Sequence, residues 1–158
     1  MNLSFLIPVK LESEDRVRNL TTVLSFLSKF NSQILIKESD ISPKFESFVL
    51  PNLKNTDYID YTFEKQNNNF FHKTKILNDL IDKSTTEVVA NYDTDVILPV
   101  KSIQKAYEMI ISHQSDAVYP YGCGVFQRAV KYTPDVYEKY INSNLDDKSI
   151  DLLKSDSI

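Results

Sequence analysis

The fold is decided by residues 85–98, which run Thr-Thr-Glu-Val-Val-Ala-Asn-Tyr-Asp-Thr-Asp-Val-Ile-Leu. An apolar run with β propensity ends there in two carboxylates, Asp93 and Asp95, and the chain then turns apolar again. This pattern is typical of a buried strand that presents acids at its carboxyl end. Because ligands of open α/β sheets bind outside the carboxyl ends of the strands, we expect Asp93 and Asp95 to lie where a ligand or metal binds.

The spacing of Asp93 and Asp95 suits a shared cation. On an extended chain, residues two apart point to the same side, so both carboxylates can offer oxygen ligands to one Mg²⁺ or Mn²⁺. The Asp-x-Asp tripeptide alone is a weak signal, because aspartate is frequent in this chain and common in turns. The alternative is a strand that ends in solvated turn residues.

Composition predicts one ordinary globular domain, because 158 residues of which 42% are hydrophobic and 25% charged suffice for a core. The formal net charge is −4, and Lys73, Lys75 and Lys83 form no long basic stripe with interleaved aromatics. Nucleic acid is therefore not expected as the main partner. No apolar run approaches the length of a membrane span. With only two glycines, Gly122 and Gly124, the sequence excludes the glycine-rich phosphate loops of dinucleotide-binding and P-loop proteins.

The single cysteine and the first residues of the chain indicate a cytoplasmic protein. A lone Cys123 excludes an intrachain disulfide framework and a cysteine-based zinc site, and it fits a reducing compartment. Residues 1–8 lack a basic leader and are followed by Glu12, Glu14 and Asp15, which is not typical of a signal peptide.

Hydrophobic periodicity predicts alternating strands and helices. Short β-type runs predict strands, and apolar residues that recur at spacings of three and four predict amphipathic helices. Besides the strand that ends at Asp93, strands are expected at residues 3–8, 33–37, 58–63 and 116–119, with 125–132 as a further candidate. Helices are expected from Pro99 onward and at residues 13–30, 71–83, 134–141 and 145–154. This order predicts an α/β fold with a mostly parallel sheet flanked by helices.

Several weak motifs, taken in order, resemble the donor half of GT-A glycosyltransferases of the family 2 type. They are a first strand ending Ile-Pro-Val-Lys, a second strand ending at Glu38, a helix with Lys73 and Asn78, and the segment Tyr-Asp-Thr-Asp-Val-Ile-Leu-Pro. The resemblance spans residues 3–120 and implies a GT-A (nucleotide-diphospho-sugar transferase) fold. It also implies metal-dependent transfer of a sugar from a nucleotide-diphosphate donor, a UDP-sugar, to an acceptor.

The resemblance implies residues that bind the uridine of the donor. In this family the end of the first strand and the acid after the second strand hold it, and these positions match Pro8, Val9 and Glu38. The family usually has an aspartate pair before Gly-Ser where this chain has Glu38-Ser39-Asp40. The alternative for Glu38 is an ordinary exposed turn acid.

The resemblance implies further residues that bind the donor or its metal. In this family a basic residue early in the helix before the aspartate motif faces the nucleotide, and here His72 or Lys73 matches it. An asparagine is common farther along that helix, and here Asn78 matches it. By the same resemblance, Asp95 is the main ligand of the metal, Mn²⁺ or Mg²⁺. Asp93 reaches the same metal, a metal-bound water or the ribose. A divalent ion stabilises the charge that builds on a diphosphate leaving group. For His72 the alternative is a solvated residue at a helix start.

The resemblance also implies partners and a domain plan. The acceptor would be a saccharide or a lipid-linked saccharide, at the cytosolic face of a bacterial membrane with peripheral association. Residues 1–121 would form the nucleotide-sugar-binding domain and residues 122–158 a partial continuation, and we find no counterpart there of the family's acceptor region. The fold is therefore expected to be incomplete at the C-terminal side.

Two other function classes compete with a transferase. A receiver-type signalling domain requires acids at the end of its first strand, and this chain has Pro8-Val9-Lys10 there. A noncatalytic α/β interaction module, or an inactive fragment, is supported by the missing acceptor region.

Overall fold

The computed structural model describes residues 1–67, 70–122 and 128–154. The chain divides into two compact units, Met1–Val96 and Ile97–Ile158. The division at residue 121 that the resemblance implies stays a prediction. Unit one contains, in chain order, β1 (Leu3–Val9), α1 (Glu14–Leu27), η1 (Ser28–Phe30), β2 (Gln33–Asp40), η2 (Phe45–Val49), η3 (Leu50–Asn52), β3 (Ile59–Lys65), α2 (Lys73–Lys83) and β4 (Val88–Asn91).

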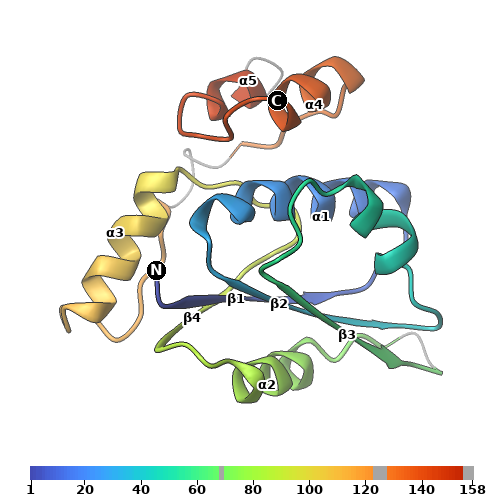
Figure 1. The fold of residues 1–158 in the computed structure, drawn as a ribbon, viewed down its shortest axis with the longest axis horizontal. Coiled ribbons are helices and arrows are strands. Elements are labelled where there is room, and N and C mark those ends of the chain that lie inside the picture. Colours follow the sequence, from blue (N-terminus) through green and yellow to red (C-terminus); the bar gives the residue numbers. More distant parts are fainter. Residues whose placement is uncertain (68–69, 123–127, 155–158) are drawn as a thin grey trace. The chain divides into compact units, whose positions relative to one another are not determined.

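The sheet of unit one has the strand order β3-β2-β1-β4, and every pair is parallel (Figure 1). Leu6 of β1 pairs with Leu35 of β2 on one side and with Asn91 of β4 on the other. The four carboxyl ends therefore lie at one edge of the sheet. The predicted α/β class with a parallel sheet flanked by helices is confirmed.

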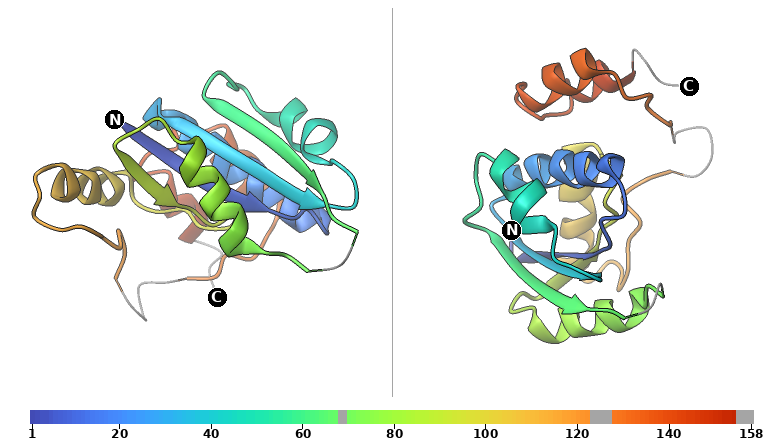
Figure 2. Two further views of the ribbon diagram at one scale, coloured as in Figure 1. Left: turned by 90° about the horizontal axis from the view of Figure 1, so that it is seen from below. Right: turned by 90° about the vertical axis from the view of Figure 1, so that its right-hand side faces the viewer.

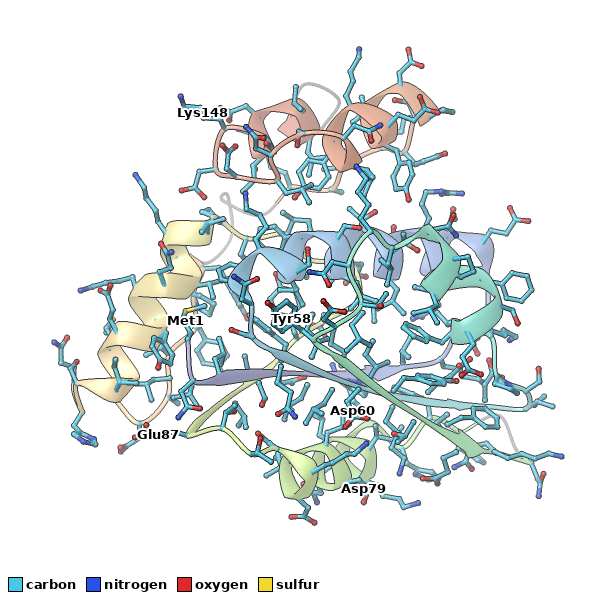
Figure 3. The ribbon with its side chains drawn as sticks, in the orientation of Figure 1. Met1, Tyr58, Asp60, Asp79, Glu87 and Lys148 are labelled. Atoms are coloured by element: carbon cyan, nitrogen blue, oxygen red, sulfur yellow. The ribbon has the colours of Figure 1, made fainter. Side chains whose placement is uncertain are left out.

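Helices cover both faces of this sheet. Figures 1 and 2 show α1 on one face and α2 on the opposite face, and η2 packs against α1. Every residue of β1 is consequently buried. Beneath α2 a core cluster joins Leu6 and Leu35 of the sheet to Ile76 and Leu80 of the helix. Figure 3 shows side chains filling both spaces between helix and sheet.

Local sequence explains the start of α1. The Oγ atom of Ser13 accepts a hydrogen bond from the backbone N–H of Arg16 at 3.3 Å, and Glu14 and Asp15 occupy the first turn. Their negative charges lie at the positive end of the helix dipole. The predicted helix over residues 13–30 is confirmed, with its last turn formed by η1.

Two strands differ from the prediction near the carboxyl edge. β2 continues through Asp40, so Glu38 and Ser39 belong to the strand and do not follow it. β4 ends at Asn91 and is an edge strand whose residues are mostly half-buried or exposed, so the expectation of a buried strand before Asp93 is wrong. With a single neighbouring strand, β4 lacks the cover that buries β1.

Unit two contains α3 (Val100–Ile111), α4 (Pro134–Ile141) and α5 (Ile150–Lys154). Thr133 caps α4 as predicted, accepting a hydrogen bond from Val136 N–H. At the start of α3, the carboxylate of Asp147 accepts a hydrogen bond from Val100 N–H at 2.5 Å. No helix among the described residues is both long and apolar enough to cross a bilayer.

Two predictions for unit two are wrong. Residues 116–119 form no strand and are largely exposed. The helix expected from residue 145 begins only at Ile150, because Leu145 has a left-handed backbone with φ of 51° and Asp146 then forms a turn with Ser149. The candidate strand 125–132 lies partly outside the described residues, as Cys123 does wholly; residues 128–132 show only an isolated bridge at Val130.

Candidate functional site

The order of the strands places a topological switch point between β1 and β4. From β1 the chain passes through α1 to β2 on one side, whereas from β3 it passes through α2 to β4 on the other side of β1. The loops that leave β1 and β4 therefore diverge at the carboxyl edge, which is where open α/β sheets bind ligands.

A shallow depression of about 130 Å³ lies at this switch point. Its walls come from the end of β1, the loop and first turn of α1 that follow, the segment before α2, and the loop after β4; they are Pro8, Val9, Lys10, Glu12, Arg16, Phe71 and Thr94. The volume is below the several hundred Å³ typical of ligand pockets. The depression alone is therefore smaller than a typical ligand pocket.

The depression joins two of the segments predicted to bind the donor. Pro8 and Val9 line it from β1, and Thr94, the residue between Asp93 and Asp95, lines it from the loop after β4. These segments are more than 80 residues apart in sequence, and the parallel pairing of β1 with β4 brings them together.

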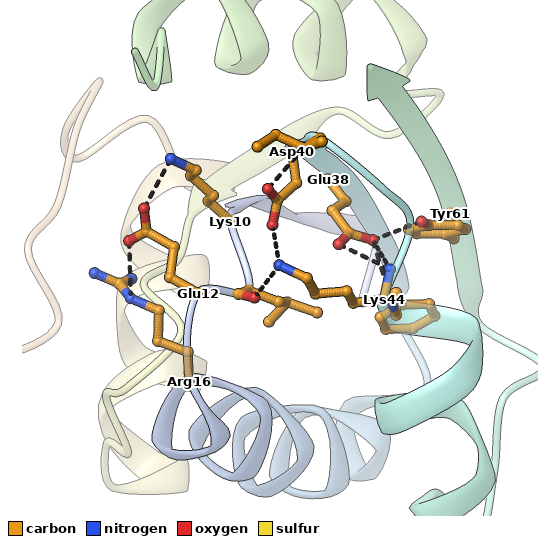
Figure 4. Close-up of polar contacts among 10 residues, drawn as sticks. Lys10, Glu12, Arg16, Glu38, Asp40, Lys44 and Tyr61 are labelled. Atoms are coloured by element: carbon orange, nitrogen blue, oxygen red, sulfur yellow. Dashed lines mark hydrogen bonds and ion pairs between the residues drawn. The ribbon is translucent and has the colours of Figure 1, made fainter. Parts of the chain in front are cut away.

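The charged wall of the depression is built from Lys10, Glu12 and Arg16 (Figure 4). Lys10 Nζ lies 2.7 Å from Glu12 Oε1, and Arg16 Nε lies 3.8 Å from Glu12 Oε2. The hydrogen bond and the charge of Lys10 hold the pKa of Glu12 below its ordinary value. The side chain of Lys10 is 12% exposed and that of Glu12 is 51% exposed.

Asp93 and Asp95 lie in the loop that follows β4. The Tyr92 N–H still donates to Leu6 O at 3.0 Å, and the chain then turns at Thr94 and Asp95. The aspartates are therefore not on an extended strand, and the expectation that strand geometry points them to one side is wrong. Both side chains are exposed, and Asp93 Oδ1 forms an ion pair with Lys73 Nζ at 2.7 Å.

The described part of the chain brings no larger set of metal-ligating side chains to Asp93 and Asp95. Among residues 1–67, 70–122 and 128–154, no group of three or more His, Cys, Asp or Glu side chains is placed to hold a metal. Mg²⁺ commonly takes only one or two carboxylates and completes its shell with phosphates and water. Metal binding by Asp93 and Asp95, which flank Thr94 at the depression, stays a prediction.

The predicted basic and amide residues lie on α2, whose N-terminus is at the carboxyl edge because the helix follows β3. Lys73 is its first residue and contacts Asp93. His72 precedes the helix, is exposed, and packs its ring 6.3 Å from that of Phe70. Asn78 is exposed farther along the helix. Of these three, the structure thus joins only Lys73 directly to the aspartate loop.

Glu38 is completely buried, and its carboxylate has protein donors. It accepts hydrogen bonds from the backbone N–H groups of Lys44 and Phe45 at 3.0 and 3.1 Å, and from the Tyr61 hydroxyl at 2.6 Å (Figure 4). Burial and the hydrogen bond to Glu38 raise the pKa of Tyr61. The carboxylate therefore fixes η2 and β3 at the end of β2, and its contact with uridine stays a prediction.

A lysine ties this buried network to the loop after β1. Lys44 Nζ donates to Asp40 Oδ2 at 2.7 Å and to the Leu11 carbonyl oxygen at 2.8 Å. Burial raises the pKa of Asp40, but hydrogen bonds from Lys44 and from Ile41 N–H outweigh it and hold that pKa below its ordinary value. The loop that carries Lys10 and Glu12 is thus anchored next to the depression.

Sequence reasoning did not single out Lys10, Glu12, Arg16, Phe71 or Thr94 as site residues. The one available signal was position, because Lys10 directly follows β1 and Arg16 lies in the first turn after it. Comparisons with known proteins add no assignment: no family model matches the sequence, and no curated protein matches it.

Proposed function

We propose that this chain carries the donor-binding half of a metal-dependent glycosyltransferase of the GT-A type, which binds a UDP-sugar with Mn²⁺ or Mg²⁺. The observation that carries the proposal is the depression at the β1–β4 switch point, which is lined by Pro8 and Val9 and by Thr94 between the two aspartates. The resemblance implies a mostly parallel sheet flanked by helices, with the donor bound at the ends of its strands.

The charges support the same assignment. A nucleotide diphosphate needs cations, and the edge provides Lys10 and Arg16 in the depression and Lys73 beside Asp93. The exposed Asp93 and Asp95 would hold the divalent ion, with Asp95 as its principal protein ligand. That ion would neutralise the diphosphate as the glycosidic bond breaks. Lys73 would turn from Asp93 toward the phosphates.

The acceptor is proposed to be a saccharide or a lipid-linked saccharide, and the location to be the cytoplasm with peripheral membrane association. The acceptor and the membrane association follow from the resemblance alone, whereas the cytoplasmic location is also supported by the single cysteine. The catalytic base is not assigned to any residue. Should the donor site fail its test, a noncatalytic α/β interaction module or an inactive fragment is the remaining candidate.

Thermal unfolding tests the proposal, because a ligand that binds only the native state raises the midpoint. The midpoint is measured alone, with UDP, with MnCl₂, and with both. We expect a rise of several degrees with both together and little with either alone. Asp95→Asn removes this joint rise, whereas Asp82→Asn, an exposed aspartate near the other end of α2, keeps it. A cooperatively folded chain without any joint rise contradicts the proposal.

A further inference from the structure

The charged wall of the depression includes one negatively charged side chain, Glu12. Glu12 stands between two cations, and each of its carboxylate oxygens faces a different one: Oε1 faces Lys10 and Oε2 faces Arg16. A phosphate group with two oxygens directed at the same cations has the same arrangement of charge. The carboxylate thus occupies the position that suits an anionic ligand.

The side chains of Lys10 and Glu12 differ in how far they can move. Lys10 is mostly buried and follows a strand, and its loop is anchored by Lys44 through the Leu11 carbonyl. Glu12 is half exposed, so its side chain can rotate into solvent without loss of core packing. Phe71 forms an apolar wall and is partly buried against the core cluster beneath α2. Lys10 and the wall are therefore held in place, whereas the side chains of Arg16 and Glu12, 52% and 51% exposed, can both move, so the carboxylate can leave while Lys10 stays.

We propose that Glu12 occupies the position of a ligand phosphate, and that this phosphate displaces Glu12 to bind between Lys10 and Arg16. The inference rests on the proposed donor site and names the diphosphate as the anion concerned. Glu12 acts as an internal competitor: it weakens anion binding and keeps the two cations neutralised until a ligand of higher charge arrives.

A matched pair of variants tests the competition. Glu12→Gln and Asp15→Asn each remove one negative charge near the start of α1, but Asp15 pairs with Arg18 at 2.6 Å and does not line the depression. The probe is inorganic pyrophosphate without metal, titrated into the folded chain in a calorimeter. We expect Glu12→Gln to tighten pyrophosphate binding about two- to fivefold, the contribution of one exposed ion pair, and Asp15→Asn to change it much less.

Lys10→Met supplies the converse measurement, because it removes one of the two cations and should weaken pyrophosphate binding. Unfolding midpoints of all variants show whether each is folded at the titration temperature. Equal tightening by Glu12→Gln and Asp15→Asn overturns the inference, since it reports only net charge. Weaker binding by Glu12→Gln also overturns it, because Glu12 would then contact the ligand directly.

The outcome for wild type separates this inference from the proposed function. If wild type and Glu12→Gln both bind no pyrophosphate while UDP with Mn²⁺ still raises the unfolding midpoint, the competition is refuted and the donor site stands. If pyrophosphate binding responds to Glu12→Gln as expected while UDP with Mn²⁺ has no effect, the anion site stands and the donor proposal fails.

Discussion

The Nζ atom of Lys73 lies 2.7 Å from Oδ1 of Asp93, which joins the first residue of α2 to the loop after β4. The two side chains come from separate predicted motifs, the basic residue at the helix start and the aspartate motif. Their ion pair places an ammonium group where a divalent cation is proposed to bind. If the proposed metal binds there, it would compete with Lys73 for the carboxylate of Asp93.

Replacing Lys73 by methionine should raise the affinity for Mn²⁺. Removal of the competing ammonium leaves Asp93 open to the cation, and an exposed ion pair contributes about 0.2–1 kcal/mol, so Mn²⁺ should bind up to about fivefold more tightly. UDP affinity in the presence of Mn²⁺ should fall, because Lys73 is proposed to face the phosphates. Calorimetric titration with MnCl₂, and then with UDP, measures both.

Lys75→Met is the matched control for Lys73→Met. It removes the same charge from the same helix, but Lys75 pairs with Glu64 at 2.7 Å. If both variants change Mn²⁺ affinity equally, the effect is one of net charge, and a direct competition between Lys73 and the metal is excluded.

Glu38→Gln should destabilise the fold. An amide in that place presents an NH₂ group to at least one of the donors from Lys44, Phe45 and Tyr61, and a hydrogen bond to a charged group contributes about 1.5–3 kcal/mol. We expect a loss of about 2–3 kcal/mol in the free energy of unfolding, measured in urea. Tyr61→Phe, which removes one hydroxyl, should cost about 1 kcal/mol.

The same variant tests the uridine contact that the resemblance implies for Glu38. A Glu38→Gln protein that is as stable as wild type but has lost UDP binding would show that the carboxylate serves the ligand and not the fold. A destabilised protein that keeps its UDP affinity, measured below its unfolding midpoint, would assign Glu38 to the framework.

The ion pairs of Glu64 should make the stability of the fold depend on pH in the acid range. Hydrogen bonds from Lys37 and Lys75 lower the pKa of Glu64 from its ordinary value of 4.5 to about 2. Because the folded-state pKa is depressed, the ionised carboxylate stabilises the fold above about pH 4.5, and this stabilisation is lost as the pH falls toward 2.

The pH dependence is measured as a difference between variants. The advantage of wild type over Glu64→Gln in unfolding free energy should be full at pH 6 and shrink progressively at pH 4 and pH 3. Glu87→Gln, at an exposed position, is the control for the loss of one negative charge. An advantage over Glu64→Gln that stays constant down to pH 3 would refute the assigned ion pairs.

Hydrophobic periodicity was sufficient to predict the helices and strands of unit one. A long amphipathic helix has one apolar face to bury, and a β-branched run favours a strand. It failed at residues 116–119, which form no strand and are largely exposed. It also failed at Leu145, whose left-handed backbone no hydrophobic pattern reveals. Both errors depend on tertiary context and not on local propensity.

The candidate site was predictable only in part for a similar reason. Pro8 and Val9 end β1 and Asp93 follows β4 closely, positions which a pattern of strands can locate. Arg16 and Phe71 are ordinary residues of a helix turn and a connecting segment, and only the crossing of the chain at the switch point brings them together. The burial of Glu38 was missed because β2 is longer than its apolar run.

The central claim, a nucleotide diphosphate and metal at the β1–β4 switch point, is tested most directly by paramagnetic broadening in amide NMR spectra of the labelled chain. Mn²⁺ at a low fraction of the protein concentration, added with excess UDP, should broaden the amide signals of Thr94 and Val9 at the carboxyl edge. The signals of Leu3 and Ile59, at the opposite ends of their strands, should stay sharp. Broadening centred elsewhere, or none while UDP and Mn²⁺ are both present, would contradict the account.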